Sequence, residues 1–201
     1  MTERELIALG VVSGLGLVAL ALGGRRDYPG RPLAGGGELD PALLALTADW
    51  LHPVPPHPDG RLPAVSDGWK VRPSGHLHRA ADLMYARTFP GPPRLPTLSS
   101  LYEMPDGIRA RAVARGRVSA SRQYRTGGAV RIWHAGNLVT QYLHLAERFV
   151  AAGDVVEQGQ PIGVIGYNPV DYKLNHLHFE LLLDGKIPVD PEPYLSRWRA
   201  T

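Results

Sequence analysis

The segment His176–Leu183, H-L-H-F-E-L-L-L, alternates between two kinds of side chain. In a β-strand, successive side chains point to opposite faces of the sheet. One face of this strand would therefore be wholly apolar, and the other would carry His176 and His178. An apolar strand face must be covered by a second layer of structure. This segment therefore predicts a strand that lies over a core and presents two imidazoles on its other side.

The chain from about residue 65 onward contains more segments of this kind, separated by Gly, Pro, Asp and Asn. No convincing long helix lies between them, and 23 glycines and 19 prolines in 201 residues favour turns over helices. We predict an all-β fold, a mostly antiparallel sandwich or barrel. The predicted strands are Trp69–Arg72, Ala81–Tyr85, Ile108–Ala114, Arg117–Gln123, Ala129–His134, Leu138–His144, Pro161–Tyr167 and His176–Leu183. The proline-rich stretch 89–98 is expected to be a loop.

The N-terminal region differs from the rest of the chain. Residues 6–24 carry no charge, and as a helix they would extend about 28 Å, close to the thickness of a bilayer core. We predict a hydrophobic helix in residues 1–24 that acts as a membrane anchor or a secretory signal, or is embedded in an assembly. Residues 25–64 are interpreted as a Gly/Pro-rich linker with a short helix that begins after Asp40. Residues 65–196 form the predicted β-domain, and 197–201 a tail.

Composition removes several classes of site. The chain has no cysteine, so a disulfide, a thiolate metal site and a cysteine nucleophile are excluded. The formal net charge is only +3, and no block of five or more Lys and Arg residues occurs, so nucleic-acid binding is not expected. A metal site in this chain must be built from histidines and carboxylates.

Three separate segments supply such residues. His78 and Asp82 are four residues apart, and in an extended segment they share a face. His144 lies in a further predicted strand, where Tyr142 would share its face. A catalytic zinc usually has three protein ligands and an open position for water. His78, Asp82 and one histidine of the pair His176/His178 meet that count, and the remaining histidines would lie beside the open position.

The order of these motifs resembles a known family. H-x-x-x-D, then Y-x-H-L, then H-L-H-F-E is similar to the pattern of the M23 (LytM/lysostaphin-type) zinc metallopeptidases, and the resemblance runs from about Trp69 to Tyr194. One departure is Ala80, where the family usually has glycine. The resemblance implies that zinc is bound by His78, Asp82 and His178, that His176 is the general base, and that His144 assists it and stabilises the oxyanion. Tyr142 is expected to contact the substrate or to hold His144.

The expected function is the zinc-dependent hydrolysis of peptide bonds in peptidoglycan cross-links or stem peptides. This activity would take place in the cell envelope, with residues 6–24 as anchor or signal, or in a bacteriophage virion. An alternative is a non-catalytic M23-like domain that binds the cell wall or activates another hydrolase. Two further alternatives fit the sequence less well. A lipoyl-type carrier domain would need a lysine at a tight turn, and none of Lys70, Lys173 and Lys186 is in that setting. A 2-His-1-carboxylate iron oxygenase would leave His144 and the surplus histidine unexplained.

Overall fold

The computed structural model describes residues 39–88 and 101–201. The predicted hydrophobic helix within 1–24 and the predicted loop 89–98 lie outside the described residues. Within the described ranges, no helix is both long enough and apolar enough to cross a membrane. Residues 38–201 form one compact unit.

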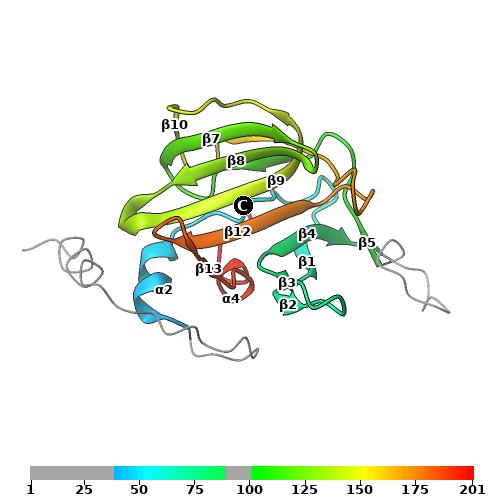
Figure 1. Cartoon of the computed structure of the whole chain (residues 1–201), viewed down its shortest axis with the longest axis horizontal. Helices are drawn as coiled ribbons and strands as arrows, with labels where there is room; N and C mark the ends of the chain where they lie inside the picture. Colours follow the sequence, from blue (N-terminus) through cyan, green and yellow to red (C-terminus); the bar gives the residue numbers. More distant parts are fainter. Residues whose placement is uncertain (1–38, 89–100) are drawn as a thin grey trace, which may run out of the picture. The chain divides into compact units, whose positions relative to one another are not determined.

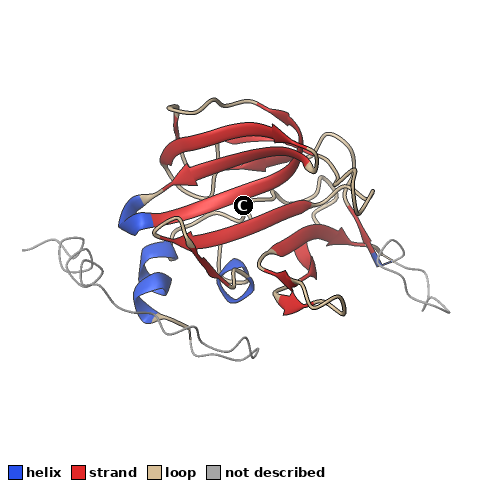
Figure 2. Ribbon diagram, in the orientation of Figure 1, coloured by secondary structure: helices blue, strands red, loops and turns tan. Residues whose placement is uncertain are grey.

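The regular structure of this unit consists mainly of antiparallel strands (Figures 1 and 2). The main sheet has the order β1-β4-β12-β9-β8-β7-β10. In addition, β5 pairs with β4, β13 with β12, and β11 with both β9 and β6, while β2 and β3 form a separate hairpin. All the strand pairs are antiparallel, which confirms the predicted fold class. The strands are β1 (Pro63–Asp67), β2 (Lys70–Val71), β3 (Leu77–His78), β4 (Ala81–Ala86), β5 (Tyr102–Glu103), β6 (Arg109–Arg111), β7 (Gly116–Tyr124), β8 (Gly127–Trp133), β9 (Leu138–Arg148), β10 (Val155–Val156), β11 (Pro161–Ile165), β12 (Leu177–Leu183) and β13 (Ile187–Val189).

Strand β12 shows the predicted alternation. Leu177, Phe179 and Leu181 are fully buried in the core, whereas His178 and Glu180 lie on the other face and are half-buried. β12 pairs with β4 on one side and with β9 on the other, so its polar residues are held between two neighbouring strands. The apolar face that defined the strand therefore also determines where its histidine lies.

The segment before the first strand packs on the same core. Helix α2 (Pro41–Thr47) begins as predicted, because the Asp40 carboxylate accepts a hydrogen bond from the Ala42 amide at 2.9 Å. Trp50 is buried and stacks at a ring distance of 5.1 Å on Trp198, which comes after helix α4 (Glu192–Leu195). Parts of the predicted linker and of the predicted tail thus belong to the compact unit.

His52 requires a correction. The proline-rich sequence around His52, within the segment interpreted as a linker, favours a surface position for a lone histidine, but His52 is buried, and its Nδ1 lies 3.0 Å from the carbonyl of Val54. The reason is a long-range contact, since the His52 amide also bonds to the carbonyl of Arg199, at the far end of the chain.

A chain of buried polar groups crosses the core. The Val113 amide donates to the Tyr142 hydroxyl at 3.0 Å, which lies 3.2 Å from the Thr140 hydroxyl, and that hydroxyl lies 2.8 Å from His134 Nε2. His134 Nδ1 must donate to the carbonyl of Arg115, 3.1 Å away, because a carbonyl only accepts. In the neutral ring, Nε2 is then the nitrogen without a proton, and it faces the Thr140 hydroxyl. Burial lowers the pKa of His134 to about 4.

We predict that His134→Gln weakens the acid destabilisation of the fold. The unfolded histidine titrates at about 6.5, so between pH 6.5 and pH 4 the unfolded state binds a proton that the folded state does not. The free energy of unfolding should therefore fall as the pH is lowered through this window. His134 should contribute about 2.5 kcal/mol of that loss between pH 7 and pH 4.5, and the variant should lack it in urea unfolding at both pH values.

The matched control is His76→Gln, because the His76 side chain is exposed. It should leave the difference between pH 7 and pH 4.5 as in the parent protein. An equal loss in the parent and in His134→Gln would show that His134 is not buried as a neutral group.

Candidate metal centre and active site

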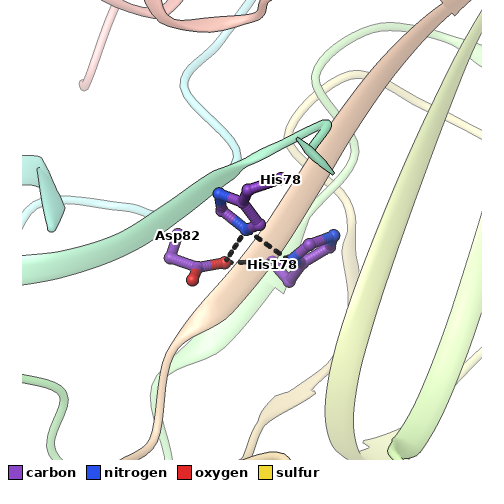
Figure 3. A group of neighbouring side chains, drawn as sticks. All are labelled: His78, Asp82 and His178. Atoms are coloured by element: carbon purple, nitrogen blue, oxygen red, sulfur yellow. Dashed lines mark hydrogen bonds and ion pairs between the residues drawn. The ribbon is translucent and has the colours of Figure 1, made fainter. Parts of the chain in front are cut away.

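His78, Asp82 and His178 converge from three strands (Figure 3). Asp82 Oδ1 lies 2.9 Å from His178 Nδ1 and 3.3 Å from His78 Nε2, and these two nitrogens are 3.2 Å apart. The cross-strand pairing of His178 with Asp82 places them side by side, while His78 comes from the hairpin β2–β3. The three predicted ligand atoms all lie within 4.8 Å of one another.

Outer hydrogen bonds decide which ring nitrogens point into this cluster. His78 Nδ1 lies 2.8 Å from the carbonyl of Gly68, and His178 Nε2 lies 3.3 Å from Glu180 Oε1. Both oxygens are acceptors, so in the neutral rings each of these nitrogens carries the proton and the opposite nitrogen has a lone pair. Two such nitrogens and a carboxylate oxygen facing one point could hold a metal ion in place of a proton. Such outer partners are typical of metal-binding histidines, and the donor set fits zinc.

The backbone at Ala80 is compatible with its side chain. Asn137, His144 and Asp184 are the non-glycine residues with positive φ in the described part of the chain, so Ala80 is not among them. Ala80 is fully buried, and its methyl group needs no strained backbone. The departure from the family pattern between His78 and Asp82 therefore leaves the two ligands in place.

His144 reaches the site through an irregularity in β9. Its φ is +65°, and the pairing of β8 with β9 shifts there, because Gly128 is opposite Leu145 and Ala129 is opposite Leu143. His144 is the extra residue, and such a bulge re-aims a side chain. Its ring lies 4.8 Å from that of His176 and 5.4 Å from that of His178. His144 and His176 therefore both lie beside the cluster of His78, Asp82 and His178.

Tyr142 does not share the face of His144, and the expected substrate contact is corrected. The bulge breaks the alternation, so Tyr142 points into the core, where it is fully buried with its ring 5.3 Å from that of Phe179. Its hydroxyl accepts a hydrogen bond from the Val113 amide and is also hydrogen-bonded to the Thr140 hydroxyl. Tyr142 supports β9 from the core side rather than lining the site.

Burial and charge separate the histidines into two kinds. Burial lowers the pKa of His144 to about 4 and also lowers the pKa of His176, so both rings are neutral at pH 7. The pKa of His178 is also pulled down by burial, but hydrogen bonds to Asp82 and Glu180 raise it to about 9. For Asp82, burial is outweighed by the hydrogen bonds from His178 and His78, which hold its pKa well below the usual range. Positive charge is thus favoured at the ligand cluster and disfavoured at His144 and His176.

Both neutral rings have a defined tautomer. His144 Nδ1 lies 2.6 Å from the carbonyl of Thr126, and His176 Nδ1 lies 2.7 Å from the carbonyl of Leu174, so each Nδ1 is the donor. Their Nε2 atoms carry lone pairs, and that of His176 lies 3.9 Å from Asp82 Oδ1. The arrangement therefore provides two unprotonated nitrogens next to a metal cluster, as acid–base chemistry requires.

The cluster lies in a cleft of about 390 Å³. Arg72, which the sequence alone did not single out, contacts Asp67 at 3.2 Å and approaches Asp82 Oδ2 to 3.9 Å and Asp171 to 3.6 Å. Tyr172 packs near His176 with a ring distance of 5.4 Å. Neither residue belongs to a spaced motif, so neither could be found without the fold. Glu180 was visible in H-L-H-F-E, on the same strand face as His178.

Comparisons with known proteins found similarity in both sequence and fold. Residues 99–191 match the model described as Peptidase family M23. The peptidoglycan DD-endopeptidases ShyC and ShyA of Vibrio cholerae are 42% identical over 59 residues and 35% identical over 86 residues. These segments cover 29% and 42% of this chain, but only 13% and 20% of the two relatives. The catalytic domain of lysostaphin from Staphylococcus simulans has the same fold, with a TM-score of 0.51 and 21% identity over 69% of this chain and 94% of that one.

We predict that the two histidines of H-L-H differ in their effect on metal binding. His178→Ala removes a nitrogen that faces Asp82 and His78, and it should abolish stoichiometric zinc binding. His176→Ala removes a ring whose Nε2 is 3.9 Å from Asp82 and should retain zinc. Elemental analysis after dialysis, with a chelator competition for affinity, measures both. Equal loss of zinc in the two variants would contradict the assignment of His178 as the ligand.

Proposed function

We propose that this chain is a zinc-dependent endopeptidase that hydrolyses peptide bonds in peptidoglycan, because residues 99–191 match the model of Peptidase family M23 and segments of the chain are similar to the peptidoglycan DD-endopeptidases ShyA and ShyC. The bonds would lie in cross-links or stem peptides. The observation that carries the proposal is the convergence of three ligand atoms with two neutral imidazoles beside them. A purely structural zinc would have four protein ligands and no need of such neighbours.

His78, Asp82 and His178 would hold the zinc. When bound, zinc polarises a substrate carbonyl and lowers the pKa of a coordinated water toward neutrality. Glu180 would orient His178 toward the ion, and the Gly68 carbonyl would orient His78, because each accepts a hydrogen bond from the ring nitrogen that points away from the ion. The burial of the cluster excludes bulk water and strengthens these interactions.

His176 is assigned as the general base. Its Nε2 is unprotonated, and the nearby Asp82 carboxylate stabilises the positive charge that the ring gains when it accepts a proton from the attacking water. The Leu174 carbonyl holds the ring in this orientation. The same proton can then pass to the leaving amine, which returns His176 to its neutral state.

His144 is assigned a supporting role. Its Nδ1–H is bound to the Thr126 carbonyl, so its Nε2 could stabilise an oxyanion only as a protonated donor, with the proton taken from a second water in the cleft. Its pKa, lowered by burial to about 4, keeps the free ring neutral at pH 7. Negative charge that develops on the substrate would raise that pKa, so the stabilisation is specific to the transition state.

The proposed substrate also bears on the cellular location of the protein. The substrate requires access to the cell wall, and we propose that residues 6–24 anchor the protein to the cell-envelope membrane or direct its secretion. A role in a bacteriophage virion is the alternative, because breaching the wall needs the same chemistry. Residues 6–24 lie outside the described part of the structure.

We predict that the zinc-loaded full chain releases new peptide termini from defined peptidoglycans. Digestion of diaminopimelate-type and glycine-bridged walls, with mass spectrometry of the products, identifies the bond. Removing zinc with a chelator should abolish release, and adding zinc back should restore it.

His176→Ala tests whether the domain is catalytic or only binds the wall. It should keep zinc and wall binding but lower the rate of release by at least about 100-fold, because general base catalysis contributes about 10²–10⁴ in rate. The control is Arg197→Gln, which changes an exposed residue outside the cleft and should leave the rate unchanged. An unchanged rate in His176→Ala would refute the assigned base, and zinc-loaded protein that binds walls without cutting any would support the non-catalytic alternative.

A further inference from the structure

A second hollow lies on the solvent face of the sheet, beside the metal cleft. It has a volume of about 970 Å³ and is lined by residues of β7, β8 and β9 and by residues 184–186, which come directly after β12. Thr126 and Leu143 line both this groove and the cleft over the metal cluster. The two hollows are therefore adjoining, and Thr126 is also the residue whose carbonyl orients His144. A ligand bound at the metal cluster could therefore extend into this groove.

The groove is basic. Its lining carries Asp184 as its one acidic side chain and four basic ones, Arg122, Arg125, Arg131 and Lys186. Within residues 39–88 and 101–201, none of these four forms an ion pair. Several arginines elsewhere do have carboxylate partners: Arg61, Arg72, Arg87 and Arg115. Uncompensated cations that line a hollow attract an anionic ligand.

The register of the sheet relates Arg122 to the metal cluster. Arg122 is opposite Ala129, Ala129 is opposite Leu143, and Leu143 is opposite His178. Three steps of about 4.8 Å place Arg122 about 14 Å from His178. An extended peptide spans about 3.3 Å per residue, so Arg122 would meet a substrate about four residues from the cluster.

Arg131 lies closer, in the neighbouring row. It is opposite Gln141, which is opposite Glu180, so about 10 Å or three peptide residues separate it from β12. Its guanidinium donates to the carbonyl of Gly185, which holds the group beside the groove. A side chain at Gly185 would clash with Arg131 and Trp133, at 2.8 and 2.9 Å. The close approach at this glycine is what positions the guanidinium.

Two aromatic residues add apolar surface to the same groove. Tyr124 is 50% exposed and Trp133 is 38% exposed, and both line it. Exposed aromatic rings beside arginines suit a ligand with both carboxylates and apolar stretches, as in an acidic peptide.

We propose that this groove is a subsite for an acidic peptide segment on one side of the scissile bond, with Arg131 and Arg122 binding carboxylates about three to four residues from it. This inference rests on the proposed endopeptidase function and specifies its substrate. It makes the basic groove a determinant of specificity, separate from the metal cluster.

The test uses two cross-linked stem-peptide dimers of the same sequence, one with free α-carboxylates and one with carboxamides. The zinc-loaded full chain should cleave the free acid with a kcat/KM about tenfold higher, as two partly exposed ion pairs would give. Arg122→Gln/Arg131→Gln should remove most of this preference by slowing only the acidic substrate, and Arg122→Gln, at an exposed position, should remove about half of it on a logarithmic scale. Arg197→Gln is the matched control and should keep the full preference.

A binding experiment separates this inference from the proposed function. Calorimetry with the monomeric stem tetrapeptide, as free acid and as carboxamide, measures affinity without cleavage. If the acid binds about tenfold more tightly and the double variant loses that difference, the groove is supported even when no bond is cut. Cleavage and binding of both forms with equal efficiency would overturn the subsite and leave the endopeptidase standing. Absence of both cleavage and preferential binding would overturn both.

Discussion

The position of β12 between β4 and β9 is the constraint on which the site depends. Its apolar face is buried against the core by Leu177, Phe179 and Leu181, so the strand cannot rotate or slip by one residue without exposing all three. Asp82 is then opposite His178 in one neighbour, and Leu143 is opposite it in the other. The metal cluster is thus positioned by hydrophobic burial on the far side of the sheet rather than by its own hydrogen bonds.

Sequence alternation was sufficient for β12 but not for β9. In H-L-H-F-E-L-L-L every second residue faces the core, so the polar face of the strand could be predicted directly. In β9 the same rule placed Tyr142 beside His144, and the structure separates them, because His144 adopts positive φ in a bulge. This conformation depends on the partner strand, where a Cβ at Gly127 would come within 3.0 Å of the His144 Cα. The alternation of side chains along a strand does not predict where a bulge inserts an extra residue.

The other gaps in prediction have the same physical origin. His52 is buried because residues near the two ends of the unit pair with each other, Leu51 with Arg199. Arg72 and Tyr172 reach the cleft from loops with no recognisable spacing. The grouping of His78 and Asp82 with one histidine of the H-L-H pair was predictable because zinc requires particular donor types in a countable number, whereas the choice of His178 came from the resemblance to the M23 family. Hydrogen-bond partners such as Thr126 and Leu174 could not be predicted from the sequence, because they act through backbone carbonyls, which any residue supplies.

The family match covers only part of this arrangement. Residues 99–191 include His144, His176 and His178, but His78 and Asp82 come from the segment before them and are joined to the site by the pairing of β12 with β4. The fold by itself does not establish catalysis, because a fold can carry more than one function. The contrast in electrostatics adds support for the proposal, since Asp82 and Glu180 make the cluster of His78, Asp82 and His178 favour a cation, while burial keeps His144 and His176 neutral. The imidazoles of His78, His144, His176 and His178 would repel one another if all were protonated, and a division into metal ligands and neutral neighbours, as proposed above, avoids that repulsion.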